Sequence, residues 1–155
     1  MIRHAVENDI PEICRFGINE VQEVGGEMLG WGAHCESIAK NVLGCIEGRV
    51  PGVAIVCEID EKIIGMFIAQ FLSQVTDERK WSAREVTWYV LPEYRGNGLG
   101  QSMREKAIKC AARKGLQQFW LSVMLRPGHE RAVEKMQEGG FYPVSIQMMK
   151  NLSEE

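Results

Sequence analysis

Residues 86–114 constrain the fold of this chain more than any other stretch. Residues 86–90 are a run of β-branched and aromatic side chains, which predicts a strand. Pro92 has no amide hydrogen to donate and therefore ends the strand. Three glycines follow within five positions, Gly96, Gly98 and Gly100. Apolar residues then recur at helical spacing up to residue 114. We therefore predict a strand, a glycine-rich turn and a helix in direct succession.

This glycine-rich turn is a predicted anion site. Backbone amides in such a turn point outward, and the dipole of the helix that follows adds positive potential. Arg95 places a full positive charge at the rim. These features together predict a phosphate or pyrophosphate ligand. The alternative is a tight strand-to-helix turn that binds nothing.

The spacing of the turn narrows the class of ligand. No Gly-Lys-Ser/Thr follows it, and its glycines do not fit the G-x-G-x-x-G pattern of dinucleotide folds. Arg95, Gly98 and Gly100 do fit R-x-x-G-x-G, and Val90 and Pro92 form a V-x-P step before it. This combination resembles the pyrophosphate-binding motif of the GNAT N-acetyltransferase superfamily, whose acyl donor is acetyl-coenzyme A.

Strands and helices are predicted along the whole chain. We expect strands at residues 2–6, 53–59, 62–72, 86–91, 118–124, 141–144 and 146–149, and helices at residues 10–24, 36–47, 101–114 and 130–138. Residues 73–82 are polar and predict a surface loop. This order predicts an α/β or α+β sheet with helices on both faces. The resemblance implies a mixed, mostly antiparallel sheet of about six or seven strands with about four helices. It also implies that strands 86–91 and 118–124 form a splayed parallel pair.

Composition limits the other classes of protein. The 155 residues predict a single domain, at 1–150, with a frayed tail at 151–155. The net charge of −3 and the lack of a polybasic tract argue against nucleic acid as a partner. No apolar stretch reaches the ~20 residues of a membrane span, and the start of the chain carries no secretory signal. Five scattered cysteines without a CxxC pair predict reduced thiols in a cytoplasmic protein, and no metal site.

The resemblance implies how coenzyme A would be held. Its pantetheine arm would lie between the splayed strands, on the backbone of Tyr89, Val90 and Leu91. An amide near Val90 would stabilise the oxyanion. The pyrophosphate would lie on the turn and the helix start: Arg95, Gly96, Asn97, Gly98, Leu99, Gly100 and Gln101. His129 is a further candidate on the cofactor side, because it replaces an asparagine that the family often has there.

Acetyl transfer to an amine needs a base, because only the neutral amine attacks. Glu85 is the candidate, since partial burial at the start of its strand would raise its pKa. The family's usual acidic position falls on Arg84, so Glu85 is one residue out of register and needs a bulge to face the site. The alternatives are a solvent-facing carboxylate at Glu85 and a relay of ordered water.

The general acid is where this sequence departs from the family. The usual tyrosine falls at Met136, between Ala132 and Gly140. A thiolate with a pKa near ~8.5 leaves tolerably well without an acid, and Ser122, His129 or Tyr142 are the stand-ins.

We expect residues 27–35, the second helix, the 73–82 loop and the closing strands to form the acceptor side. Trp31, His34 and Trp88 are the candidate contacts, although both tryptophans are also readable as core residues. The implied activity is transfer of an acetyl group from acetyl-coenzyme A to a primary amine of a small molecule or a protein. The amine would attack directly in a ternary complex, since none of the cysteines lies at the end of the pantetheine strand with an adjacent base. The rivals are a catalytically weak regulatory or interaction module that binds coenzyme A, and an acyltransferase for longer acyl groups. A homodimer is an expectation for such folds.

Overall fold

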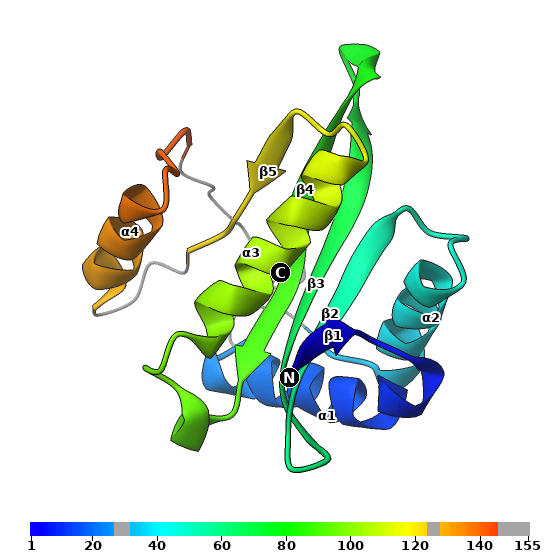
Figure 1. Ribbon diagram of the computed structural model, residues 1–155, viewed down its shortest axis with the longest axis vertical. Helices are drawn as coiled ribbons and strands as arrows, with labels where there is room; N and C mark the ends of the chain where they lie inside the picture. The colour runs from blue at the N-terminus through cyan, green and yellow to red at the C-terminus, as the bar shows by residue number, and fades with distance from the viewer. Residues whose placement is uncertain (27–31, 124–127, 146–155) are drawn as a thin grey trace, which may run out of the picture.

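A computed structural model describes residues 1–26, 32–123 and 128–145 of the chain. Five strands form one mixed sheet in the order β1-β2-β3-β4-β5 (Figure 1). The strands are β1 (Ile2–His4), β2 (Gly52–Ile59), β3 (Lys62–Gln74), β4 (Asp77–Val90) and β5 (Gln118–Trp120). Neighbouring strands from β1 to β4 are antiparallel, and β4 pairs with β5 in parallel. The expected mixed, mostly antiparallel sheet is confirmed, whereas the expected six or seven strands are not.

The described residues contain four α-helices, the number predicted: α1 (Ile10–Glu23), α2 (Cys35–Ile46), α3 (Leu99–Arg113) and α4 (His129–Glu138). Two short 3-10 helices, η1 (Glu7–Asp9) and η2 (Pro92–Tyr94), precede α1 and the glycine turn. Helices α1 and α2 cover one face and α3 covers the other (Figure 1). No helix among the described residues is long and apolar enough to cross a bilayer.

Each face of the sheet has its own apolar core. Phe16 and Ile13 of α1 pack with Met66 on one face, while Met103 of α3 packs with Phe67 on the other. All five of these side chains are fully buried. The sheet is therefore a two-sided core layer, and β4 is placed between α1 and α3.

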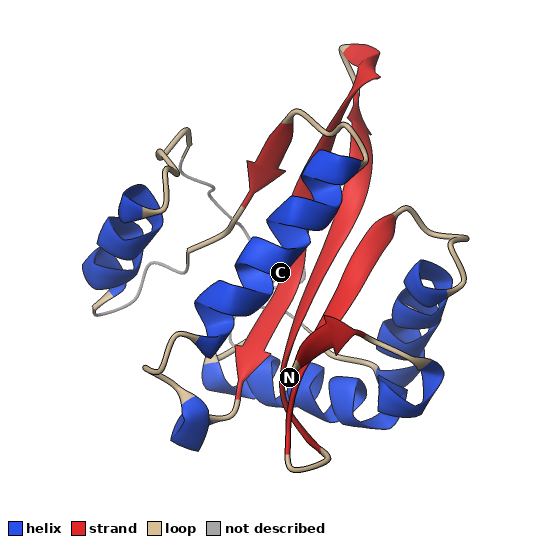
Figure 2. Cartoon of the chain, viewed as in Figure 1, coloured by secondary structure: helices blue, strands red, loops and turns tan. Residues whose placement is uncertain are grey.

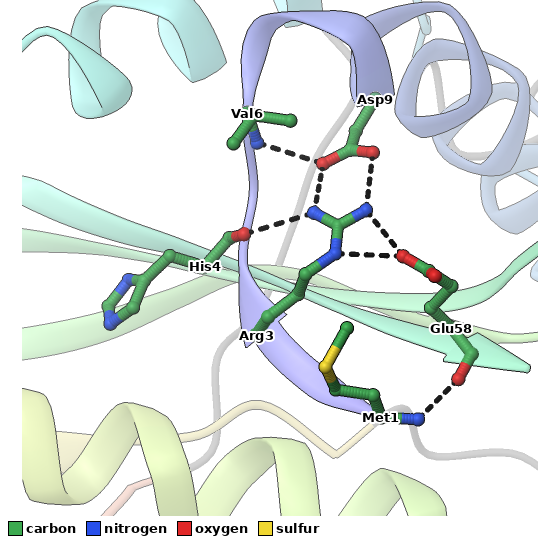
Figure 3. A network of polar contacts seen from close by, with 6 residues as sticks. All are labelled: Met1, Arg3, His4, Val6, Asp9 and Glu58. Atoms are coloured by element: carbon green, nitrogen blue, oxygen red, sulfur yellow. Dashed lines mark hydrogen bonds and ion pairs between the residues drawn. The ribbon is translucent and has the colours of Figure 1, made fainter. Parts of the chain in front are cut away.

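Arg3 fixes the start of α1 against the sheet (Figure 3). Its guanidinium donates to Asp9 at 2.7 and 2.9 Å and to Glu58 of β2 at 2.8 Å. The buried Asp9 carboxylate also accepts the Val6 amide at 2.8 Å. Burial by itself would raise the pKa of Asp9, but the Arg3 guanidinium and the Val6 amide outweigh burial and lower it. This network holds the helix that carries the acidic residues described below.

Three predicted segments differ in the structure. Residues 73–82 are not a loop, because β3 runs to Gln74 and β4 starts at Asp77, which makes one long hairpin (Figure 2). Strand β5 ends at Trp120 rather than at residue 124. Residues 141–144 form no strand, and the strand expected at 146–149 lies outside the described residues.

Candidate active site

Strands β4 and β5 pair only over a short distance. Their register joins Ser82 to Gln118, Ala83 to Phe119 and Arg84 to Trp120. β4 then continues to Val90 without a described β5 partner, so this part of its backbone is open on one side. We call it the β4 edge, meaning the backbone of residues 86–90 on the side of β5. The parallel pair predicted to splay is therefore present, and it separates after Arg84.

The alternation of amides along β4 decides which ones face this edge. The Leu91 amide donates to Ile64 O at 3.0 Å and therefore faces β3. Adjacent residues of a strand direct their amides to opposite sides, so Val90 and Trp88 direct theirs to the β4 edge. Among the three backbones expected to contact pantetheine, only Val90 faces the edge, whereas Tyr89 and Leu91 face β3. The Trp88 amide, which is not among the three predicted contacts, also faces the edge.

A bulge in β4 settles how Glu85 is aimed. Ile68 of β3 pairs with Thr87, and the next residue, Ala69, pairs with Glu85. Val86 is therefore the extra residue, and its side chain is 52% exposed. A bulge of this kind re-aims side chains next to it. The bulge therefore compensates for the one-residue offset between Glu85 and position 84, where the family usually has its acidic residue.

The Glu85 carboxylate lies at the point of separation between β4 and β5. Its Oε2 accepts the Ser122 amide at 3.1 Å, just after β5 ends. The pKa of Glu85 is raised to about 7. Burial is the main cause and the Glu20 carboxylate adds to the increase, whereas the hydrogen bond from Ser122 lowers the pKa. A carboxylate with this pKa accepts protons at neutral pH, which is what a general base requires.

Two further carboxylates reach this region from α1. Glu20 accepts a hydrogen bond from the Thr87 hydroxyl and another from the Trp88 amide, the latter at 3.4 Å. Burial raises the pKa of Glu20, and these hydrogen bonds oppose the shift. Glu23 lies one turn further along the helix. Neither residue is among the site residues predicted from the sequence, although Glu20 lies on the same helical stripe as Ile13 and Phe16, which was a signal for it.

The positive charge that Arg95 places at the rim of the turn is paired within the protein. Its Nε donates to Val90 O at 2.7 Å, and its Nη2 lies 2.9 and 3.0 Å from the two carboxylate oxygens of Glu23. The guanidinium also stacks 5.2 Å from the ring centroid of Tyr89, whose hydroxyl donates to Glu23 at 2.8 Å. Arg95 therefore links the turn, the β4 edge and the end of α1.

The glycine turn fits a pyrophosphate without this side chain. Gly96 and Gly98 have φ of 85° and 82°, a region that favours glycine. An added Cβ at either residue would meet no atom within 4 Å, so the space in front of the turn is open. α3 starts at Leu99, and its first amides have no partner within the helix. The Leu99 amide lies 3.4 Å from Asn97 Oδ1. Outward amides at a positive helix end match a doubly charged anion.

Gly100 has a packing role instead. A Cβ there would lie 2.9 Å from Cζ2 of the Trp88 indole, so the third glycine lets α3 approach that ring. The ring also lies 5.6 Å from Phe67, in the core between the sheet and α3. The Trp88 side chain is thus a core residue, while its amide faces the β4 edge.

The remaining predicted site residues are dispersed. Ser122 engages Glu85 through its amide. His129 is the first residue of α4, with Nδ1 3.7 Å from Glu130. His34 is the exposed N-cap of α2, and Tyr142 is 76% exposed. Trp31 lies outside the described residues.

The position of the family's tyrosine is filled by a thioether beside a buried cation. Met136 Sδ lies 2.7 Å from Nη1 of Arg104, a side chain on α3. Arg104 is only 5% exposed, its guanidinium lies 5.4 Å from the Phe141 ring, and its Nε has no hydrogen-bond partner among the described residues. Burial lowers the pKa of Arg104, and nearby Glu105 opposes the shift. Met136 cannot donate a proton to a leaving group.

The sequence matches the model of the acetyltransferase (GNAT) family over residues 25–137. This is well over half of the chain, and the chain therefore belongs to the GNAT family of acetyltransferases, which use acetyl-coenzyme A as acyl donor. No match was found among the curated proteins.

Solved structures share the fold at low sequence identity. One is a predicted acetyltransferase with acetyl-CoA from Clostridium acetobutylicum, with a TM-score of 0.76, 16% identity, and coverage of 100% of this chain and 97% of that one. A transcriptional regulator from Bacillus halodurans C-125 has a TM-score of 0.76 and 19% identity, with coverage of 98% and 99%. An aminoglycoside acetyltransferase in complex with sisomicin, from an uncultured soil metagenomic sample, has a TM-score of 0.71, 16% identity, and coverage of 99% and 96%. At these identities the likeness concerns the fold.

Proposed function

We propose that this chain is an acetyl-coenzyme A-dependent N-acetyltransferase that acetylates a primary amine by direct attack in a ternary complex. The observation that carries the proposal is Glu85. Its carboxylate lies where β4 and β5 separate, and its pKa is raised to about 7. A buried carboxylate within a strand gains nothing structural from such a pKa, whereas a base for amines does.

Each half of the reaction has residues to perform it. The amides of residues 96–101 would hold the pyrophosphate, and the Val90 amide would hold the pantetheine arm. Glu85 would take the proton of the attacking ammonium, directly or through one water. The Trp88 amide would donate to the thioester oxygen as negative charge builds on it. Acetyl-coenzyme A supplies the activated acetyl group and a thiolate that leaves with a pKa near ~8.5.

After the attack the nitrogen must lose a second proton to become the amide, and the departing thiolate must gain one, so the balance closes when a donor protonates the sulfur and is itself reprotonated from the nitrogen. Because Met136 cannot be this donor, we nominate Ser122 and His129, with solvent as the alternative source. Loss of a dedicated acid lowers the rate by roughly 100-fold in other systems, and it leaves a working enzyme.

Two rival functions are a coenzyme A-binding module without catalysis and an acyltransferase for longer acyl groups. The fold is shared with a protein described as a transcriptional regulator, which keeps a non-catalytic coenzyme A-binding module in view. The acyl group is the second open point, and butyryl-coenzyme A in place of acetyl-coenzyme A tests it. The acceptor class, small molecule or protein amine, is left to the screen.

The test has two steps. Acetyl-coenzyme A must first raise the melting temperature, because binding to the folded state stabilises it by mass action. Release of free thiol is then followed with a panel of amines, for wild type and for Glu85→Gln. We expect turnover in wild type and a loss of about 100-fold in kcat for Glu85→Gln. Stabilisation without any turnover would leave the binding module, and turnover unaffected by Glu85→Gln would remove Glu85 as the base.

A further inference from the structure

The Trp88 amide that the reaction needs is covered by a side chain of the protein itself. Glu20 Oε1 lies 3.4 Å from this amide nitrogen, and Glu20 also accepts the Thr87 hydroxyl. The carboxylate oxygen therefore stands where the oxygen of a bound thioester would accept the same hydrogen bond. Both oxygens cannot occupy that position, so Glu20 must leave the amide before the thioester is polarised.

Glu20 and Glu23 lie on one face of α1 but differ in their partners. Glu23 is ion-paired with Arg95 at 2.9 Å. Glu20 has no ion pair with any described cationic side chain, and it lies close enough to Glu85 to raise the pKa of that carboxyl. Once displaced from the Trp88 amide, Glu20 would be a half-buried carboxylate facing a second carboxylate with no cation between them. Such an arrangement is unfavourable unless the ligand supplies the positive charge.

The reacting nitrogen cannot supply that charge throughout the reaction. It must lose its proton to attack, and it becomes a neutral amide in the product. A cationic group elsewhere on the acceptor keeps its charge from binding to product release. It can therefore balance Glu20 in the ground state and in the transition state.

We propose that Glu20 is a displaceable internal ligand of the Trp88 amide and the binding partner of a second cationic group on the acceptor. The preferred acceptors are then diamines and larger polycationic amines. Binding of the acceptor draws Glu20 off the amide and opens it to the thioester, so acceptor and donor bind synergistically. This inference rests on the proposed function.

The test measures synergy in the absence of turnover. The donor probe is the ketone analogue of acetyl-coenzyme A, in which a methylene group replaces the thioester sulfur. Plain coenzyme A, which lacks the acetyl carbonyl, is the matched donor control. Cadaverine carries two ammonium groups, and pentylamine of the same chain length carries one. Calorimetry gives the affinity of each donor probe with and without each amine.

In wild type we expect cadaverine to increase the affinity for the ketone analogue by about 10-fold, and pentylamine to change it by less than about 2-fold. Neither amine should change the affinity for plain coenzyme A. Glu20→Ala should bind the ketone analogue more tightly without amine, because the competitor is gone, and should lose the synergy. Glu20→Gln removes the charge at constant size and should also lose the synergy, which covers the case in which the alanine variant folds poorly.

Glu12→Ala is the matched control variant. It removes the same charge from α1, where Glu12 is ion-paired with Arg15 on the surface. It should behave as wild type in every titration. In turnover assays, Glu20→Ala should raise KM for cadaverine about 10-fold relative to KM for pentylamine.

Three results would overturn the proposal: synergy that survives in both Glu20 variants, equal effects of the two amines, or synergy with plain coenzyme A. Absence of binding by coenzyme A and by its ketone analogue to wild type would be a different result, because it would remove the proposed function itself.

Discussion

The two halves of the candidate site are built from different materials. The proposed donor half consists of backbone amides, those of Trp88 and Val90 on the β4 edge and those of residues 96–101 at the positive end of α3. The acceptor half consists of carboxylates from distant segments, with Glu20 on α1 and Glu85 on β4. Arg95 and Glu23 form the ion pair that joins the two halves. If both proposed halves bind as expected, the site would place an anion and a cation side by side by using backbone dipoles for the anion and side-chain charges for the cation.

One negative charge added to the glycine turn should strongly weaken the binding of acetyl-coenzyme A by the donor half. We expect Gly98→Asp to lower the affinity for acetyl-coenzyme A by about 1,000-fold, because a carboxylate ~4 Å from a phosphate costs about 4 kcal/mol at an effective dielectric constant of 20. Gly98→Asn is the control, since it has the same size and the same backbone strain at φ of 82° without the charge. Calorimetry compares the two variants. Equal affinities would remove the turn as the pyrophosphate site.

Removal of the Glu85 carboxylate, the proposed general base, should slow the reaction in the acceptor half. Glu85→Gln should lower kcat about 100-fold with little change in KM for acetyl-coenzyme A. In wild type, kcat/KM for the amine should rise with pH through about 7, as Glu85 of the free enzyme loses its proton. The variant should lack this limb of the pH–rate profile. A wild-type profile in the variant would show that another group takes the proton.

Glu85 also links the site to stability. Its pKa is raised in the folded state, so between the ordinary value of 4.5 and about 7 the folded chain holds a proton that the unfolded chain has lost. Stability therefore falls as pH rises through this window. Glu85→Gln should be less sensitive to pH there, as urea denaturation at several pH values would reveal.

The link between the halves has a smaller effect. Glu23→Gln removes the carboxylate that competes with the pyrophosphate for Arg95. We expect an affinity for acetyl-coenzyme A increased about 3-fold, and a loss of stability below about 1 kcal/mol, because both partners of this ion pair are partly exposed. Calorimetry and urea denaturation measure the two quantities. Weaker binding would mean that Glu23 positions Arg95 for the ligand instead.

The smallest expected effect lies outside both halves. Arg104 is a buried cation whose Nε has no partner within the part of the chain that the structure describes, and replacing buried charged groups with well-packed apolar ones is often neutral or stabilising. Arg104→Met should therefore change the free energy of unfolding by between zero and about +1 kcal/mol. Arg113→Met on the exposed end of α3 is the control. A loss above about 2 kcal/mol would show that the guanidinium holds α4 in place.

The sequence predicted the turn and the helix start of the proposed donor half well, because these elements are local. A run of strand formers, a proline, three glycines and a helical repeat each depend on their own neighbours. The resulting turn and the start of α3 agree with the structure to within a few residues. The hairpin at residues 73–82 was mispredicted because its residues are polar, and a two-stranded ribbon with both faces in water needs no apolar pattern. Val75 at its tip is fully exposed.

The acceptor half depends on tertiary placement, which the sequence does not show directly. The Val86 bulge arises from the pairing of β3 with β4, and no local signal gives its position. Glu20 is close to Trp88 only because α1 packs across β4. Its place in the apolar stripe of α1 marks it as unusual, but its partner on β4 comes from the fold.

The most direct test is a crystal structure with the ketone analogue of acetyl-coenzyme A. We expect the pyrophosphate to lie on the amides of residues 96–101. We expect the ketone oxygen to accept a hydrogen bond from the Trp88 amide, and the Glu20 carboxylate to have moved away from that amide. A pyrophosphate bound elsewhere, or a Glu20 carboxylate still on the Trp88 amide beside a bound carbonyl, would contradict it.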